Sequence, residues 1–270
     1  MPDLPSSLRL VYHESEPHPR DVALADVYLD LPFPPAPPGR PYLFVNMVQT
    51  LDGQAALRGT AYSIGTDVDH YLLRQLRVNA DAVLSGAGTV RKDDVIITTH
   101  RHLQERRAGQ GRTRNPLSVV VTASCAFTDE VLATKKFFQR TDLHRLILTT
   151  DRASAEDIAR VHARGAEVHI VATDPSGEVD LEAALRFLFE TRGTRQVLCE
   201  GGPTLNTALA RGGLLDELFV TTTLRLGGDP SEPRIVSAPV TDRPLCLISE
   251  LHYADAAGVR EAYCRFRFPR

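Results

Sequence analysis

The order in which short apolar runs and helix-type patterns follow each other is the feature that most limits the fold of this 270-residue chain. From Pro41 onward, the apolar runs have the length of strands, and segments with apolar residues at helical spacing separate them. Several runs are apolar without alternation, which is typical of central strands covered on both faces. The predicted strands span residues 42–49, 81–86, 117–123, 145–150, 167–172, 195–201 and 216–226.

Capping signals mark the helices between these strands. Asp180 is a predicted N-cap, and Gly193 stands beyond the end of the apolar pattern that follows it. Ser154 and Asp157 resemble a capping box that opens a second helix. A third helix is expected over residues 69–78. Strands that alternate with helices predict an α/β fold with a mostly parallel sheet and helices on both faces.

The C-terminal part of the chain has a different pattern. The runs 246–253 and 260–268 flank a short turn-rich segment, and apolar residues alternate with polar ones in the second run. That period of two predicts an antiparallel hairpin with one covered face. The sheet is therefore expected to be mixed, and mostly parallel.

Residues 1–40 differ from the rest of the chain. Between Pro32 and Pro41 the sequence PFPPAPPGRP contains six prolines, which predict an extended connector. We expect residues 1–40 to be an N-terminal extension, with a short strand and turn on the surface. Residues 41–270 are expected to form the main domain.

Composition excludes several classes of partner. The net charge of −3 gives no bulk attraction to nucleic acid or to an anionic membrane. No apolar run is long enough to cross a bilayer, and no secretory signal opens the chain. His100 and His102 lack a third ligand at a suitable spacing, so no metal site is expected. The cysteines show no CxxC pair, which favours buried thiols and a cytoplasmic protein; they are Cys125, Cys199, Cys246 and Cys264.

Two glycine-bearing turns, at residues 85–89 and 200–204, each follow a predicted strand. In parallel α/β sheets, ligands bind beyond the carboxyl ends of the strands. Glycine lets a phosphate approach the backbone, and the next helix offers unpaired N–H groups. Pro203 suits the first position of such a helix. The two turns are therefore candidates for holding a dinucleotide pyrophosphate, although neither is a GxGxxG motif and tight turns alone would also explain the glycines.

Two carboxylates lie near predicted turns. Asp52 belongs to TLDGQ (50–54), and Asp-Gly by itself is a plain turn signal. Glu200 ends an apolar strand at the mouth of a glycine turn. A half-buried carboxylate there can orient a substrate or exchange a proton. It can equally accept hydrogen bonds from the backbone of the turn.

Three segments in the same order resemble the pyrimidine reductases of riboflavin biosynthesis. They are RPYLFVNMVQTLDGQAA, LRVNADAVLSGAGTVRKDD and QVLCEGGPTLNTALARGGLLDEL. The resemblance runs from about Arg40 to the C-terminus and extends more distantly to dihydrofolate reductases. It implies a dihydrofolate-reductase-like three-layer fold. The sequence has no HxE or PCxxC motif of the zinc deaminase domain that precedes the reductase in many bacterial proteins.

The resemblance also implies a function and a set of site residues. The expected reaction is the NADPH-dependent reduction of a ribosylamino-pyrimidine 5′-phosphate to its ribitylamino form, by a homodimer. The implied catalytic residues are Glu200 and Asp52. Those implied for the cofactor are Val48, Thr50, Gly86, Gly88, Thr89, Asp93, Thr122, Ser124, Gly201, Gly202, Pro203 and Thr204. Those implied for the substrate are Asn46, Ala61, Ser63, Arg77, Ile97 and Glu200.

The sequence departs from the family on the substrate side. Asn46 stands where the family usually carries a lysine, and the segment after Asp94 lacks the usual proline, with the arginine displaced or replaced by His100. In the family these positions lie near the sugar phosphate of the substrate. Two alternatives therefore remain open: a paralogue that reduces another heterocycle, such as a dihydropterin, and a cofactor-binding module without turnover.

Overall fold

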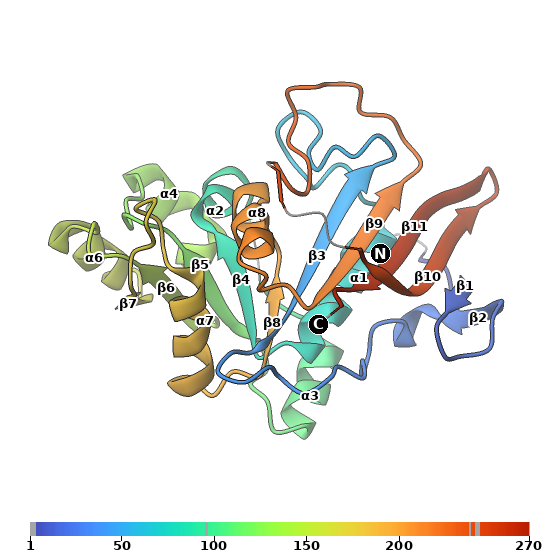
Figure 1. The fold of residues 1–270 in the computed structure, drawn as a ribbon, viewed down its shortest axis with the longest axis horizontal. Helices are drawn as coiled ribbons and strands as arrows, with labels where there is room; N and C mark the ends of the chain where they lie inside the picture. The colour runs from blue at the N-terminus through green and yellow to red at the C-terminus, as the bar shows by residue number, and fades with distance from the viewer. Residues whose placement is uncertain (1–3, 95–96, 238, 241–243, 270) are drawn as a thin grey trace.

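A computed structural model describes residues 4–94, 97–237, 239–240 and 244–269. Within these residues, one 11-stranded sheet runs through the molecule in the order β2-β1-β10-β11-β9-β3-β8-β4-β5-β6-β7 (Figure 1). The strands are β1 (Ser7–His13), β2 (Arg20–Ala23), β3 (Tyr42–Thr50), β4 (Ala82–Gly86), β5 (Leu117–Val121), β6 (Arg145–Thr149), β7 (Glu167–Ile170), β8 (Gln196–Cys199), β9 (Glu217–Thr223), β10 (Cys246–Asp255) and β11 (Gly258–Arg267).

The sheet is mixed and mostly parallel, as the sequence predicts. β3 pairs in parallel with both β8 and β9, and β8, β4, β5, β6 and β7 continue the parallel part. β11 pairs with β9 and with β10 in antiparallel orientation. β10 and β11 are the predicted C-terminal hairpin. Each strand predicted from an apolar run is present.

Helices cover both faces of the sheet and complete three layers. On one face, α7 and α8 pack against Leu43, Val45 and Val197. On the other face, α1 packs against Phe44 and Val83, and α2, α4, α5 and α6 pack beside it. The helices are η1 (Leu24–Asp26), α1 (Asp67–Leu76), η2 (Arg77–Asn79), α2 (Ala87–Lys92), α3 (Arg101–Gly109), α4 (Asp129–Thr134), α5 (Lys136–Gln139), α6 (Ala155–His162), α7 (Leu181–Glu190) and α8 (Pro203–Arg211).

The predicted helix caps are confirmed. The side chain of Asp180 accepts the N–H of Ala183 at 3.0 Å, and that of Ser154 accepts the N–H of Asp157 at 3.0 Å. α1 begins earlier than predicted because Thr66 caps it, accepting the N–H of Val68 at 3.2 Å. Each of these three helices begins directly after an oxygen-bearing side chain that accepts an N–H of its first turn.

The N-terminal segment contributes more than a surface strand and turn. β1 pairs with β10, and β2 pairs with β1, so both extend the same sheet. Leu8, Leu10 and Tyr28 are buried in the cluster that includes α1. In the proline-rich connector, Phe33 stacks on Phe44 with ring centroids 4.6 Å apart. Because β1 pairs with β10 and β9 pairs with β11, neither strand of the C-terminal hairpin has a free edge.

The exposure of each cysteine depends on its position in the fold. All four are free thiols; Cys125 and Cys199 are buried, and Cys264 is partly buried. Cys246 is exposed, contrary to the expectation of a buried thiol, because it is the first residue of β10.

A buried carboxyl group lies between α1 and the sheet. Asp69, in the first turn of α1, is 5% exposed. Burial raises its pKa to about 7, against a hydrogen bond from Thr221 that lowers it, and Glu261 raises it further. In the unfolded chain the group has its ordinary pKa of 3.8. Its neutral form therefore stabilises the fold fully below that value, and this contribution is lost as the pH rises to about 7.

We predict that Asp69→Asn makes the fold more stable at alkaline pH. The free energies of unfolding of the variant and of the natural protein should be most similar near pH 3, and the variant should be more stable by about 1–4 kcal/mol at pH 8, because only the natural protein has a buried acid that ionises less readily in the folded state. Denaturant titrations at the two pH values measure the difference. Asp67→Asn, an exposed change in the same helical turn, is the control. Parallel pH profiles for Asp69→Asn and the natural protein would contradict the assignment.

Candidate functional site

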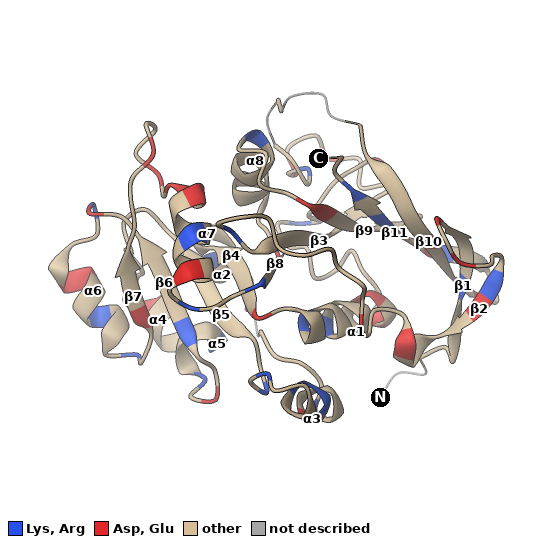
Figure 2. Ribbon diagram, turned by 60° about the horizontal axis from the view of Figure 1, so that its bottom comes forward, with Lys and Arg blue, Asp and Glu red and all other residues tan. Residues whose placement is uncertain are grey.

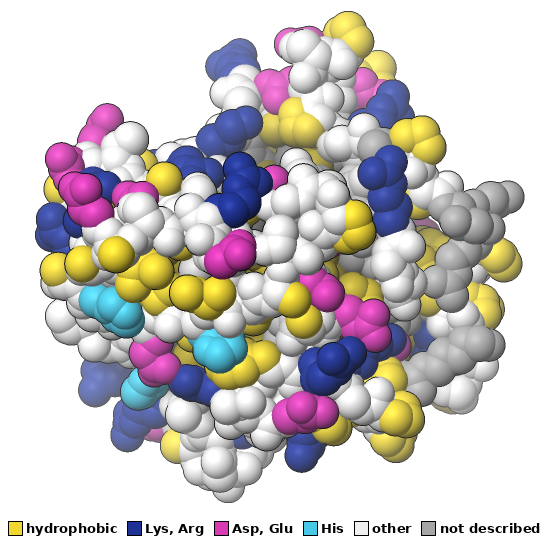
Figure 3. Space-filling model, turned by 60° about the vertical axis from the view of Figure 1, so that its left-hand side comes forward, with side chains coloured by type: hydrophobic (Ala, Val, Ile, Leu, Met, Phe, Trp, Pro, Cys, Tyr) yellow, Lys and Arg dark blue, Asp and Glu magenta, His cyan; other side chains and the backbone are white. Residues whose placement is uncertain are grey.

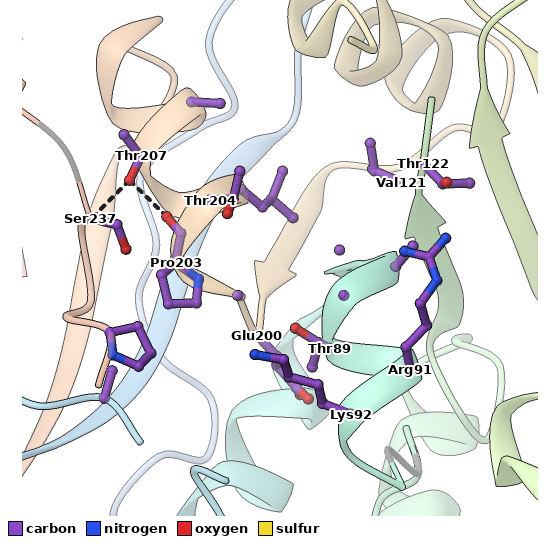
Figure 4. Close-up of a pocket in the computed structure, with 18 of the residues that line it drawn as sticks. Thr89, Arg91, Lys92, Val121, Thr122, Glu200, Pro203, Thr204, Thr207 and Ser237 are labelled. Carbon is purple, nitrogen blue, oxygen red and sulfur yellow. Dashed lines mark hydrogen bonds between the residues drawn. The ribbon is translucent and has the colours of Figure 1, made fainter. Parts of the chain in front are cut away.

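A cavity of about 930 Å³ opens at the carboxyl ends of β4, β5 and β8. Figure 4 shows Thr89 and Arg91 of α2 on one side of it and Thr204 and Thr207 of α8 on the other, with Glu200 between them at the end of β8. A cavity of this size is in the range of cofactor sites. Its position matches the sheet end predicted from the two glycine turns.

The two glycine turns meet at the edge of this cavity. The N–H of Gly86 donates to the carbonyl oxygen of Gly201 at 2.8 Å. Gly201 has φ of +81°, and a Cβ there would lie 3.0 Å from Sδ of Met47. Gly202 has φ of −81°, so its conformation suits any residue, but a Cβ would lie 3.1 Å from Oγ1 of Thr89. The backbone therefore requires glycine at position 201, and a side chain at position 202 would press on the hydroxyl group of Thr89.

The start of α8 gives this edge a positive character. Gly202 is the N-cap and makes no side-chain hydrogen bond, and Pro203 follows at the first helical position. The first N–H groups of a helix have no partner within the helix. Gly202, Pro203 and Thr204 all line the cavity. An anionic group held there would accept hydrogen bonds from the unpaired N–H groups at the start of α8.

The cavity brings together most of the residues expected to hold a cofactor. Ser124 is close in sequence to the lining residue Thr122 but is not itself part of the lining. Val48 and Thr50 lie on β3 outside the lining, and Gly201 shapes the turn behind Gly202. The expected cofactor residues that line the cavity are Gly86, Gly88, Thr89, Asp93, Thr122, Gly202, Pro203 and Thr204.

Glu200 forms a buried ion pair with Arg77 of η2. Nε of Arg77 donates to Oε1 of Glu200 at 2.6 Å, and Nη2 donates to Oε2 at 2.8 Å. The two side chains are 6% and 9% exposed. Nη1 of Arg77 also donates to the carbonyl oxygen of Thr98 at 2.9 Å. The pair joins two residues that were both expected at the substrate, and it holds the carboxylate at the wall of the cavity.

Asp52 braces a turn instead of facing the cavity. Its carboxylate accepts the N–H of Gly227 at 3.0 Å and of Gly228 at 2.9 Å, and Thr50 donates its hydroxyl proton to it. Hydrogen bonds from Gly227, then Thr50 and Gly228, hold the pKa of Asp52 well below its usual range. The carboxylate is thus ionised and occupied by these donors, and it is not part of the cavity lining.

The residues expected at the substrate are spread over two surroundings. Ala61 lines the cavity, and Ser63 is exposed nearby on the same loop. Asn46 follows Phe44 on the face of β3 that α1 covers, because alternate side chains point to opposite faces. Ile97 is only 1% exposed and belongs to the core cluster around α1, so its side chain is a core residue in this structure.

Sequence analysis missed the loops that close the cavity. Residues 224–237 follow β9 directly, and we call this segment the strap. Pro233 of the strap accepts the N–H of Ala55 at 2.7 Å, and Glu232 accepts the N–H of Gly59 at 2.7 Å. No local pattern marks such a strap, because its contacts are long-range. Other lining residues without a sequence signal are Asp174, Ser176, Glu178, Arg211 and Ser237.

On the face shown in Figure 3, acidic and basic side chains are interspersed, so neither sign of charge dominates this face. Among the described residues, no helix has both the length and the apolar character needed to cross a membrane.

Comparison with known proteins gives the family. The model of the RibD C-terminal domain matches residues 41–251. A 2,5-diamino-6-ribosylamino-4(3H)-pyrimidinone 5′-phosphate reductase of Archaeoglobus fulgidus is 33% identical over 183 residues, which are 67% of this chain and 79% of that protein. The reductase of the same name from Methanothermobacter thermautotrophicus is 32% identical, over 67% of this chain and 76% of its own length.

Solved structures agree on the fold. A pyrimidine reductase-like protein from Corynebacterium diphtheriae superposes with a TM-score of 0.71 at 23% identity, covering 85% of this chain and 92% of that chain. A bifunctional deaminase and 5-amino-6-(5-phosphoribosylamino)uracil reductase from Thermotoga maritima gives a TM-score of 0.63 at 22% identity, over 85% and 57% of the two chains. The match over residues 41–251 confirms the resemblance found in the sequence, and the chain belongs to the RibD C-terminal domain family of riboflavin-biosynthesis reductases.

Proposed function

We propose that this protein is an NADPH-dependent reductase that converts a ribosylamino-pyrimidine 5′-phosphate to its ribitylamino form. The observation that carries the proposal is one cavity bounded by two joined glycine turns and by a buried carboxylate–guanidinium pair. The names of the two archaeal relatives support the substrate class.

The residues present suit a phosphorylated dinucleotide. Gly202 has no side chain to fill the space beside Thr89, so a pyrophosphate could approach the backbone there. The N–H groups that open α8 are donors for the same group. Gly86, Gly88 and Thr204 would line the remainder of its path. When bound, the cofactor would supply the hydride for the reduction.

The preference for NADPH over NADH rests on the side chains at the end of β5 and in α2. Thr122, Arg91 and Lys92 all line the cavity, and Figure 4 shows Thr122 and Arg91 on the same side of it. Arg91 is held there because Nη2 donates to the carbonyl oxygen of Ala126 at 2.9 Å and its guanidinium lies 5.1 Å from the ring centroid of Phe127. A positioned guanidinium and a hydroxyl are suitable donors for a 2′-phosphate.

On the substrate side, Glu200 is the side chain that would take part in the chemistry. Reduction of a cyclic ribosylamine requires its sugar ring to open, and a positioned carboxylate can assist the proton movement. Arg77 fixes both oxygens of Glu200 by its fork of donors, so the carboxylate keeps one orientation. We propose that Arg77 positions Glu200 and that Glu200 contacts the sugar.

The first experiment measures NADPH consumption and NADPH binding. The natural protein should oxidise NADPH when the ribosylamino-pyrimidine phosphate is added, and Gly202→Val should lose this activity together with at least tenfold in NADPH affinity, because the new side chain fills the space beside Thr89. Gly109→Ala, which meets no atom within 4 Å, is the control for a change at glycine. A Gly202→Val protein that binds NADPH normally would show that the turn does not hold the cofactor.

The same assay distinguishes the alternative functions. Turnover of a dihydropterin alone would favour the paralogue, and NADPH binding without turnover would favour a non-catalytic module.

The second experiment tests the choice of cofactor. Arg91→Gln should raise the dissociation constant of NADPH roughly tenfold and leave that of NADH almost unchanged, since a charge-assisted hydrogen bond to the 2′-phosphate is lost. Calorimetric titration of each nucleotide measures both constants. Arg140, which is partly exposed and paired with Asp142, provides the control Arg140→Gln. An equal loss of affinity for NADPH and for NADH would refute a role of Arg91 at the 2′-phosphate.

The third experiment separates catalysis by Glu200 from its structural role. Glu200→Gln should lower kcat by about 10²-fold or more with little change in NADPH affinity. The same change leaves the charge of Arg77 buried and should cost about 3–5 kcal/mol of stability. The double variant Arg77→Met with Glu200→Gln should recover stability without recovering kcat. If stability falls and kcat does not, Glu200 is only a structural partner of Arg77.

A further inference from the structure

A segment of the N-terminal extension binds the helical turn that carries Arg77. We call residues 24–31 the clasp; it begins with η1 and lies outside residues 41–251, which match the family model. Leu24 and Tyr28 of the clasp are each 4% exposed and belong to the core cluster that includes α1. The clasp is therefore built into the layer that supports the Arg77–Glu200 pair.

Gln75, near the end of α1, uses its whole side-chain amide on the clasp. Nε2 of Gln75 donates to the carbonyl oxygens of Leu24 and Ala25, each at 2.8 Å. Its Oε1 accepts the N–H of Tyr28 at 3.0 Å. Gln75 is 0% exposed, and a buried amide that loses its partners is costly. The clasp and the end of α1 therefore fix each other's position.

Asn79, the last residue of η2, makes a second set of contacts with the clasp. Its Oδ1 accepts the N–H of Leu31 at 3.1 Å, and its Nδ2 donates to the carbonyl oxygen of Tyr28 at 2.7 Å. Asn79 is also buried. The clasp thus binds one residue before Arg77 and one residue after it.

These contacts hold the turn on the side opposite the ion pair. Gln75 and Asn79 are four positions apart, so their side chains share one face of the helical turn. Arg77 lies midway between them in the sequence, about half a turn away, and its guanidinium binds Glu200. A 3₁₀ turn such as η2 has poor hydrogen-bond geometry of its own, so neighbouring contacts set its position. A rotation of this turn would break the bidentate pair.

The clasp also reaches Arg77 through α3. Asp30 of the clasp accepts a hydrogen bond from Nε2 of Gln110 at 3.0 Å and pairs with Arg106. The next residue of α3, Arg107, is fully buried, and its Nη1 donates to the carbonyl oxygen of Arg77 at 2.8 Å. Figure 2 shows α1 and α3 on the same side of the sheet, with basic residues on each. Contacts that start at the clasp therefore fix both the backbone of Arg77 and the helix before it.

We propose that the clasp positions Arg77, and through it the carboxylate of Glu200, for the reductase reaction, with Gln75 and Asn79 as positioning residues. The proposal rests on the proposed function, in which Glu200 contacts the sugar. Gln75 and Asn79 are not part of the cavity lining, so they act only through Arg77. The N-terminal extension thereby gains a role in the reaction.

Hydrogen exchange at Nε of Arg77 reports its position without turnover. In the buried pair this N–H is bound to Glu200 and protected from water. Gln75→Met keeps the size of the side chain and removes its hydrogen bonds to the clasp. We expect it to speed the exchange roughly tenfold or more, measured by NMR with isotope-labelled arginine. The signal is assigned by its loss in Arg77→Lys, and an unchanged exchange rate in Gln75→Met would overturn the proposal.

Controls separate positioning from a general loss of stability. Val161→Ala, on α6, makes a cavity in a core cluster separate from the one that holds the clasp, and should leave the exchange at Arg77 unchanged. Gln139→Met removes another glutamine bond to a backbone carbonyl, that of Leu132, and should also leave it unchanged. Asn79→Leu removes the second set of contacts and should act like Gln75→Met, so the test does not depend on one variant. Faster exchange in Val161→Ala, equal to that in Gln75→Met, would show that Gln75 is only a structural residue.

Kinetics connect the position of Arg77 to the reaction. Gln75→Met should lower kcat roughly tenfold with little change in NADPH affinity, and should lower it no further in a Glu200→Gln background, because the pair that it positions is already broken. Equal falls of kcat in the two backgrounds would overturn the proposal. A natural protein that does not turn over the ribosylamino-pyrimidine phosphate would instead remove the proposed function, and the exchange rates would still show whether the clasp holds the Arg77–Glu200 pair.

Discussion

The buried ion pair between Arg77 and Glu200 is the interaction on which the site depends. It joins η2, in the layer below the sheet, to the end of β8, where the second glycine turn begins. Two charges removed from water are stable only when each satisfies the other, and the bidentate geometry here does so. The carboxylate therefore has a fixed place beside the cavity, and the helix layer cannot shift without exposing an unpaired charge.

The sheet divides the site into two halves. On the side of α8, glycine backbone and helix N–H groups offer neutral donors to an extended anion. On the side of α1, the guanidinium of Arg77 is paired with the carboxylate of Glu200. Glu200 lies where the halves meet. Under the proposed function, backbone donors on one side of Glu200 would bind the cofactor, and the buried ion pair would face the substrate.

Sequence patterns predicted the features that depend on local chemistry. Apolar runs predicted the strands, Asp180 and Ser154 predicted helix starts, and the glycines at 86, 201 and 202 predicted the two turns. Features made by long-range contacts were not predictable. The pairing of β1 with β10, the contact between Arg77 and Glu200 and the bracing of Asp52 by the strap each join residues far apart in the chain. Burial of Ile97 similarly depends on packing against α1, which the segment itself does not encode.

We propose that this cavity supports transfer of hydride from NADPH to the sugar carbon of a ribosylamino-pyrimidine phosphate. The most direct measurement uses NADPH that carries two deuterium atoms at C4 of the nicotinamide, with mass spectrometry of the product. One deuterium at C1′ of a ribitylamino product, from the natural protein and not from the Gly202→Val variant, is the predicted result. A deuterated NADPH that remains unconsumed, or a product without deuterium at C1′, would contradict the claim.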